Sequence, residues 1–128
     1  MKNTIGTSIQ LTVFGESHGP AVGAVLDGLA PGIPVDEVFI ASWLSRRRPS
    51  GRTDTARVEK DEFRILSGVC DGHTTGSPLT IVIPNADTRG SDYAAIQDIA
   101  RPSHADYAAQ AKYHGFQDKS GGGHFSGR

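Results

Sequence analysis

The sequence predicts an α+β fold in which an antiparallel sheet packs on helices. Several segments alternate apolar and polar residues, as half-buried strands do, and two others have the spacing and flanking residues of helices. Two of the strand-like segments are joined by a loop that contains glycine, which favours antiparallel pairing between them. Strands with intervening helices and antiparallel pairing are typical of the α+β class.

The first part of the chain is expected to contribute two strands. Residues 8–14 alternate apolar and polar side chains, and residues 21–29 form a second strand-like segment. The loop between them carries His18. A turn at Pro31-Gly32-Ile33-Pro34 then changes the direction of the chain.

A helix is predicted over residues 37–48. Asp36 is expected to cap its first turn. The apolar face is expected to consist of Val38, Ala41 and Leu44. The helix is expected to end in Arg46-Arg47-Arg48, where basic side chains complement the helix dipole, before the sequence Pro49-Ser50-Gly51 stops it.

Two further strands are predicted over residues 62–69 and 79–83, paired antiparallel. His73, in the loop between them, is expected to be exposed and inert. Cys70 is the single cysteine and is expected to be a small, partly buried residue. It cannot form an internal disulfide, which indicates a reducing compartment.

A second helix is predicted over residues 104–114. Ser103 precedes Asp106 by three residues, close to a capping-box arrangement, so His104 is expected in the first helical turn. A glycine-dense segment, residues 120–128, follows.

The composition limits the classes of function. The chain has 128 residues, enough for one domain or for a piece of a larger one. A net charge of −1 offers no electrostatic argument for nucleic-acid binding. The sequence shows no signal peptide and no apolar run of membrane-spanning length, so we expect a cytoplasmic protein without membrane association.

The segment Phe14-Gly15-Glu16-Ser17-His18-Gly19-Pro20 contains the first candidate catalytic residue, His18. An imidazole at a strand end, between glycines that let a ligand approach closely, suits proton transfer near neutral pH. The alternative is a loop histidine that makes a single hydrogen bond.

A group of arginines forms a candidate anion site: Arg46, Arg47, Arg48, Arg52 and Arg57. Their forked, permanently charged groups suit phosphate and carboxylate, and a helix end followed by a Pro/Gly loop can direct several of them at one anion. A solvated basic turn, paired with nearby acidic residues, explains the same pattern.

Arg101 and His104 form another candidate site. A helix N-terminus disfavours an imidazolium, so His104 is expected to be neutral and able to relay a proton, with Arg101 as a nearby cation. The alternative is a surface histidine at the start of a helix.

The run Gly121-Gly122-Gly123, ahead of His124, Ser126 and Arg128, exposes backbone N–H groups that can hold an anion such as a phosphate. It has neither dinucleotide-binding nor P-loop spacing, and a flexible linker is the alternative. The five histidines show no strong ligand spacing, so no metal site is predicted.

Taken together, these segments resemble the chorismate synthase family. The motifs occur in the family's order and cover nearly all of the chain. They are Phe14-Gly15-Glu16-Ser17-His18-Gly19, Asp27-Gly28 with Pro31-Gly32-Ile33-Pro34, Arg46-Arg47-Arg48-Pro49, Ile65-Leu66-Ser67-Gly68-Val69, Thr74-Thr75-Gly76, Asp92-Tyr93, Arg101-Pro102-Ser103-His104-Ala105-Asp106 and Gly121-Gly122-Gly123. Each is weak alone, but the ordered set is specific.

The resemblance implies an anti-1,4-elimination. In this reaction 5-enolpyruvylshikimate 3-phosphate loses phosphate and a ring hydrogen to give chorismate, and reduced FMN is required although no net redox change occurs. The resemblance implies that His18 protonates the leaving phosphate and that His104 manages the protonation of the flavin.

The resemblance also implies binding residues. Those expected to bind substrate, its phosphate or NADP are Arg47, Arg48, Arg52 and Arg101. Those expected to lie at the FMN are His124, Phe125, Ser126 and Arg128. NADPH is implied as the direct or indirect reductant of the flavin, and a separate enzyme is favoured because nothing in the chain resembles a reductase domain.

The family's chains are much longer, so residues 1–128 are expected to be the N-terminal portion of a single larger domain without an internal boundary. The resemblance implies that the complete enzyme is a homotetramer with a helical layer between two antiparallel sheets. The portion alone is expected to be inactive.

Two other functions fit parts of the sequence. An anion-binding module for a nucleotide or RNA, built on the arginine-rich turn, is disfavoured by the near-zero net charge and the 7% aromatic content. Salt-dependent binding of a generic oligonucleotide without a response to FMN would favour it. A portion whose apolar faces pair with copies of itself is compatible with a tetrameric family, and sedimentation tests it.

Overall fold

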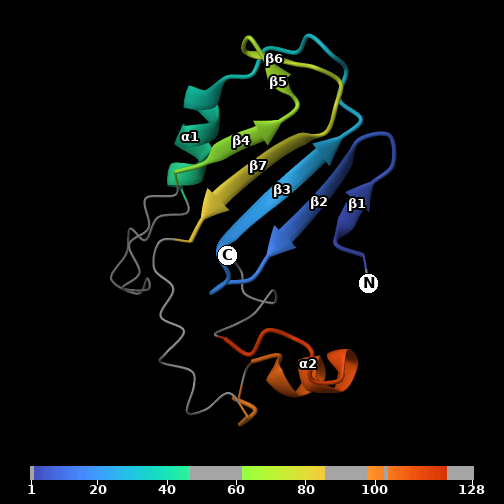
Figure 1. Cartoon of the computed structure of the whole chain (residues 1–128), viewed down its shortest axis with the longest axis vertical. Helices are drawn as coiled ribbons and strands as arrows, with labels where there is room; N and C mark the ends of the chain where they lie inside the picture. The colour runs from blue at the N-terminus through green and yellow to red at the C-terminus, as the bar shows by residue number, and fades with distance from the viewer. Residues whose placement is uncertain (1, 47–61, 86–97, 103, 121–128) are drawn as a thin grey trace.

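A computed structural model describes residues 2–46, 62–85, 98–102 and 104–120. Its main feature is a five-stranded antiparallel sheet in the order β1-β2-β3-β7-β4 (Figure 1). The strands are β1 (Thr4–Gly6), β2 (Gln10–Gly15), β3 (Ala21–Asp27), β7 (Leu79–Pro84) and β4 (Arg64–Ser67). This sheet, together with two helices, confirms the predicted α+β class.

The hairpin of β2 and β3 confirms the first two predicted strands. They pair along all of β2, from Gln10 opposite Asp27 to Gly15 opposite Val22, and the turn that joins them carries His18. Along its other edge, β3 pairs with β7. The edge strand β1 has only three residues, too few for an alternating pattern to predict it.

The predicted strand over residues 62–69 is divided in the structure. β4 pairs antiparallel with β7, as predicted, but the register shifts between Ile65 and Ser67. Gly68 follows with a φ of +85°, and a Cβ there would lie 2.5 Å from Leu79 Cα. Because only glycine allows this backbone conformation and this close an approach, the strand ends here.

After Gly68 the chain forms a small hairpin of β5 (Val69–Cys70) and β6 (His73–Thr74), at the end of the large sheet opposite the β2–β3 turn (Figure 1). His73 is exposed, as predicted. Cys70 is exposed as well, so the prediction of a partly buried cysteine is wrong. The reason is that β5 belongs to a separate two-stranded sheet rather than to the large one.

The first helix, α1 (Glu37–Ser45), is shorter than predicted. Its predicted cap is confirmed, because Asp36 Oδ1 accepts a hydrogen bond from Phe39 N at 2.9 Å. Arg46 is the C-cap residue, and its guanidinium carbon lies 4.3 Å from the centre of the Trp43 ring. The helix therefore ends before the run of arginines rather than within it.

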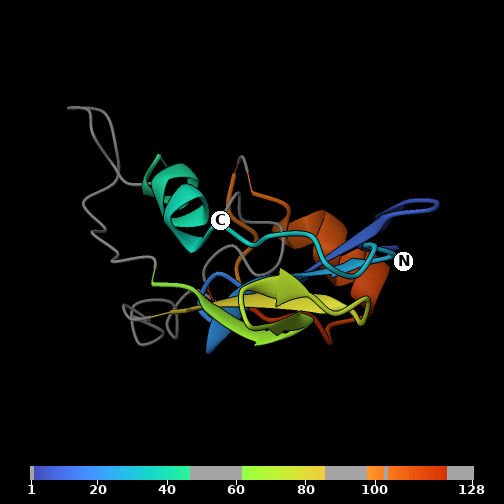
Figure 2. The same ribbon diagram turned by 90° about the horizontal axis from the view of Figure 1, so that it is seen from above.

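The predicted apolar face of α1 is wrong for Val38 and Ala41 and right for Leu44. Val38 is 80% exposed and Ala41 is exposed, whereas Ile40 and Leu44 are half-buried. These two residues are four apart and share one side of the helix. Because α1 lies beyond β4 and toward one face of the sheet (Figures 1 and 2), only this narrow side is covered.

The second helix, α2 (Asp106–Tyr113), begins two residues later than predicted. Its N-cap is Ala105, which has no capping side chain, and the expected cap residue Ser103 lies outside the described residues. His104 therefore precedes the helix, and its predicted place in the first turn is wrong. The reason is that Asp106 accepts hydrogen bonds from the backbone N and from Nε of Arg101, five residues earlier and ahead of the helix.

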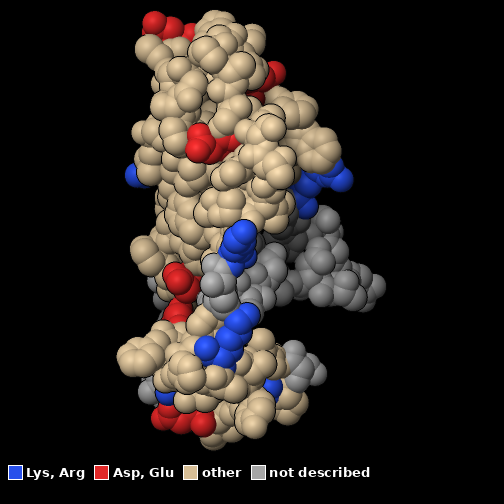
Figure 3. All heavy atoms as spheres, turned by 90° about the vertical axis from the view of Figure 1, so that its right-hand side faces the viewer, with Lys and Arg blue, Asp and Glu red and all other residues tan. Residues whose placement is uncertain are grey.

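Few apolar side chains are buried among the described residues: Leu79, Ile83 and Ala109. Large apolar side chains near and on the strands stay exposed: Ile5, Ile9, Val13, Phe14 and Leu66. Much of the apolar surface of the sheet is thus uncovered within this part of the chain. On the face shown in Figure 3, acidic and basic side chains are scattered and form no single basic patch among the described residues.

Neither α1 nor α2, the helices of the described residues, combines the length and the apolar character that crossing a membrane would need.

Candidate active site

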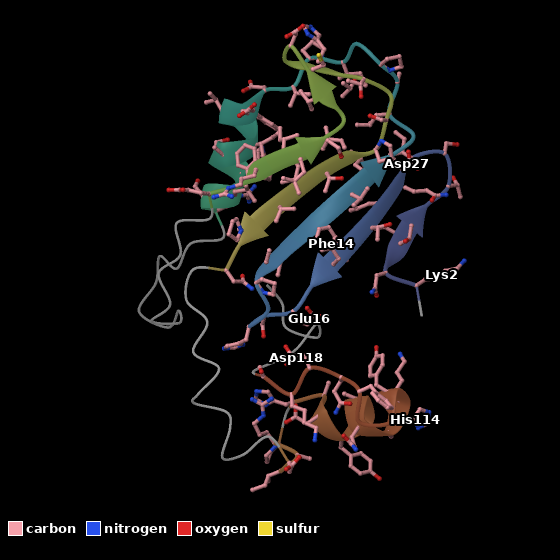
Figure 4. All side chains as sticks on the ribbon, viewed as in Figure 1. Lys2, Phe14, Glu16, Asp27, His114 and Asp118 are labelled. Atoms are coloured by element: carbon pink, nitrogen blue, oxygen red, sulfur yellow. The ribbon has the colours of Figure 1, made fainter. Side chains whose placement is uncertain are left out.

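The turn between β2 and β3 holds His18 at one end of the sheet. Gly19 N donates a hydrogen bond to Glu16 O at 3.1 Å, which closes a tight turn with Ser17 and His18 at its centre. Gly15 precedes the turn with a φ of +109°. Figure 4 labels Glu16 in this turn, at the end of the sheet that faces α2. The candidate catalytic histidine is therefore held by a turn that is continuous with the sheet.

Ser17 is the direct partner of His18, although the sequence pattern does not single it out. Ser17 Oγ lies 3.0 Å from His18 Nδ1, and Ser17 is only 4% exposed. A hydroxyl can donate to a ring nitrogen or accept from it, so this contact orients the imidazole in either protonation state. The sequence feature that could have identified Ser17 is its position next to a histidine, in a turn flanked by glycines.

A second cluster precedes α2. Arg101 donates to the carboxylate of Asp106 from Nε at 2.7 Å, from Nη2 at 2.9 Å and from its backbone N at 3.0 Å. The backbone N of His104 donates to Arg101 O at 3.3 Å, but two guanidinium nitrogens of Arg101 are directed at Asp106. A role of Arg101 toward substrate remains a prediction.

His104 is exposed, and its Nδ1 lies 3.0 Å from Pro102 O. Because a carbonyl oxygen can only accept, Nδ1 must carry the hydrogen. In the neutral ring, Nε2 is then the atom that can accept a proton. The geometry therefore supports proton exchange at His104 without its lying in the helix.

The pKa of Asp106 lies at about 2, lowered from 3.8. The side-chain hydrogen bond from Arg101 contributes most and its backbone hydrogen bond comes next, while burial acts in the opposite direction. The charges of Arg101 and His104 lower the pKa further. Because the folded-state pKa is the lower one, the pair stabilises the fold above about pH 4, and this contribution is lost as the pH falls through about 2.

We expect Arg101→Gln to raise the midpoint of the Asp106 titration from about 2 toward 3.8, because the carboxylate loses its main donors. The carboxyl carbon of Asp106, followed by NMR between acid and neutral pH, reports the midpoint. Lys119→Gln is the matched control, since it removes the contact of Lys119 with Asp98 and leaves Arg101 in place. An unchanged midpoint in Arg101→Gln would show that Arg101 does not set this pKa.

The remaining predicted site residues lie outside the described residues. They are Arg47, Arg48, Arg52 and Arg57 of the arginine group, and the triple glycine with His124, Phe125, Ser126 and Arg128. Within residues 2–46, 62–85, 98–102 and 104–120, no group of three or more His, Cys, Asp or Glu side chains could hold a metal ion. The predicted site residues that the structure describes are thus His18 and His104, each with an Nδ1 contact, and Arg101 with its ion pair to Asp106.

Comparison of the sequence with known proteins shows the family to which the chain belongs. Residues 9–128 match the family model for chorismate synthase. The chorismate synthase of Cytophaga hutchinsonii is 52% identical over 100% of this chain and 36% of that protein. That of Rhodospirillum centenum is 52% identical over 98% of this chain and 33% of that protein, and that of Campylobacter fetus is 45% identical over 98% and 35%. The chain spans about a third of the length of the curated relatives it matches.

A solved structure has the same fold. A crystal structure of chorismate synthase matches with a TM-score of 0.54 and 30% sequence identity. The match covers 84% of this chain and 25% of the other.

Proposed function

Because this chain belongs to the chorismate synthase family, we propose that it forms the N-terminal part of an enzyme that makes chorismate. The reaction is the elimination of phosphate from 5-enolpyruvylshikimate 3-phosphate, which makes the enzyme a lyase of the shikimate pathway. The observation that carries this proposal is the Ser17–His18 turn at the end of the sheet, in a chain that matches the family over residues 9–128.

His18 acts as the proton donor to the leaving phosphate. A departing phosphate develops negative charge on the oxygen of the breaking bond, and a positioned acid stabilises that charge. In the imidazolium, Ser17 Oγ accepts from Nδ1–H at the observed 3.0 Å, so Nε2–H is the donor to the phosphate oxygen. The tight turn limits the motion of the ring, which keeps this donor in place.

The arginines bind the anionic groups. Arg47, Arg48 and Arg52 follow α1 and carry the forked donors that suit the phosphate and carboxylates of the substrate or an NADP phosphate. Arg101 is the fourth proposed binding residue, and the carboxylate of Asp106 holds its guanidinium in orientation and offsets its charge.

Reduced FMN is the proposed cofactor, with NADPH as its direct or indirect reductant. The described residues fit this group, since His104 is exposed and can accept a proton at Nε2. When bound, reduced FMN supplies electron density to the substrate as phosphate departs. His124, Phe125, Ser126 and Arg128 would hold it, and His104 would hold or release a proton at Nε2.

The complete protein is proposed to be a cytoplasmic homotetramer that acts on a small-molecule substrate. Exposed apolar side chains on the strands, such as Ile5, Val13 and Leu66, support a larger assembly, because burying them would be favourable.

The proposal is tested with a full-length chimera, in which residues 1–128 are joined in register to the remaining part of the Cytophaga hutchinsonii relative. With 5-enolpyruvylshikimate 3-phosphate and reduced FMN, we expect chorismate from the chimera. We expect none from residues 1–128 alone or from the remaining part alone.

Two outcomes would contradict the proposal. A folded chimera that binds reduced FMN and forms no chorismate would count against the enzymatic function. Chorismate formed by residues 1–128 alone, at a rate comparable with that of the intact relative, would show that the remaining part is not needed.

A further inference from the structure

We propose that Asn85 is a positioning residue for His18, because its side-chain amide holds the β2–β3 turn in the shape that directs the imidazole at the leaving phosphate. This inference rests on the proposed function. Asn85 lies outside the sequence segments that contain the candidate catalytic and binding residues.

Sheet pairing brings Asn85 to the turn. β7 pairs with β3 so that Pro84 lies opposite Ala21, and Asn85 is the next residue after β7. Its backbone N donates to Pro20 O at 3.0 Å, which extends the pairing by one hydrogen bond. Its side chain therefore starts beside the turn.

The amide of Asn85 contacts backbone carbonyls on both sides of His18. Nδ2 donates to Gly19 O at 2.5 Å and to Glu16 O at 3.1 Å, and it lies 3.5 Å from Ser17 O. All three partners are carbonyl oxygens, which can only accept, so the nitrogen of the amide must face the turn. One side chain from a distant strand thus gathers the backbone groups that flank the histidine.

The oxygen of the Asn85 amide gives a second reason to assign Asn85 a role in holding the turn. Asn85 Oδ1 is buried and has no hydrogen-bond partner among the residues that the structure describes. A buried acceptor without a donor is unfavourable, so an asparagine here needs a compensating contribution. The hydrogen bonds from Nδ2 supply it.

The consequence for catalysis follows from geometry. Without the amide, Glu16 O retains only the hydrogen bond from Gly19 N within the turn, and Gly19 O loses the contact from Nδ2. The turn then gains freedom, and the imidazole loses its fixed direction. A displacement of about 1 Å at a reacting group can lower a rate by about a hundredfold. Ground-state binding of the substrate does not depend on this direction.

The test uses two substitutions in the full-length chimera. Asn85→Ala removes the amide, and Asn85→Asp keeps its shape but places oxygen instead of nitrogen against the carbonyls. We expect both to lower kcat by about tenfold to a hundredfold, with KM within about threefold of the wild-type value. Gln10→Ala is the matched control, since Gln10 also donates an amide hydrogen bond to a loop carbonyl, Thr7 O, at the opposite end of β2. It should leave both constants unchanged.

A double substitution shows whether Asn85 acts through His18. If it does, Asn85→Ala lowers kcat in the wild-type background and has no further effect in the His18→Ala background. A loss of the same size in both backgrounds, or a wild-type kcat for both Asn85 variants, overturns the inference. The proposed function fails separately, if His18→Ala itself keeps a wild-type kcat.

A second measurement needs no activity. In residues 1–128, Asn85→Ala and Asn85→Asp should speed amide hydrogen exchange in the turn by about tenfold or more and shift the ring signals of His18. Exchange in the β5–β6 hairpin should stay as in the wild type. Unchanged exchange and ring signals in the turn would overturn the inference whatever the chimera does.

Discussion

Replacing His18 by alanine in the full-length chimera is expected to lower kcat for chorismate formation by at least about a hundredfold. The substitution removes the proton donor while leaving the turn closed, because the turn's own hydrogen bond joins backbone atoms of Gly19 and Glu16. Steady-state kinetics under anaerobic conditions, with reduced FMN in excess, measures the effect. KM should change little, since the arginines rather than His18 are proposed to bind the substrate.

The matched control for this substitution is His73→Ala. His73 is an exposed histidine at the opposite end of the sheet, and its Nδ1 lies 2.9 Å from Asp71 O. Its loss should leave kcat unchanged. A near-normal rate for His18→Ala would reject the role of His18 as a general acid, and an equal loss in both variants would indicate a general structural effect.

Gly15→Ala is expected to cause the largest loss of stability. Gly15 has a φ of +109°, and a Cβ on it would collide with Ala21 O and lie 2.6 Å from Val22 Cα. Both neighbours are backbone atoms of the paired strand, which cannot move without breaking the ladder between β2 and β3. The strained conformation and the collision together are expected to lower the free energy of unfolding by about 3 kcal/mol.

Urea unfolding of residues 1–128 measures this change, and Gly32→Ala is its control. Gly32 has a similar φ of +84°, but a Cβ on it would meet nothing within 4 Å. Its substitution should cost only about 1 kcal/mol, from backbone strain alone. Equal losses at the two positions would show that close approach to β3 is not what requires glycine at the end of β2.

The sequence is most informative where local pattern decides the structure. Alternation predicts β2 and β7, a short apolar run predicts β3, and the cap at Asp36 predicts the start of α1. Local sequence pattern predicts the wrong element boundary where a single residue's conformation or contact decides it. Gly68 divides a predicted strand through its backbone conformation. The hydrogen bonds that Arg101 donates to Asp106 lie ahead of α2, which begins two residues later than predicted.

The candidate site divides in the same way. His18 can be predicted because a histidine at a strand end, between glycines, is a local signal. Asn85 cannot be predicted, because it lies 66 residues from Gly19 and reaches the turn only through the order of the strands in the sheet. The polar contacts that orient a catalytic group are therefore the part of a site that a sequence pattern reveals least.

The most direct test of the role of His18 is the pH dependence of kcat in the full-length chimera, with and without His18. A general acid acts only while it is protonated, so kcat of the wild type should fall on the alkaline side of its profile. In His18→Ala, the residual kcat should lose this alkaline fall. A profile of His18→Ala that keeps the same alkaline limb, with the same midpoint, would show that another group donates the proton to the leaving phosphate.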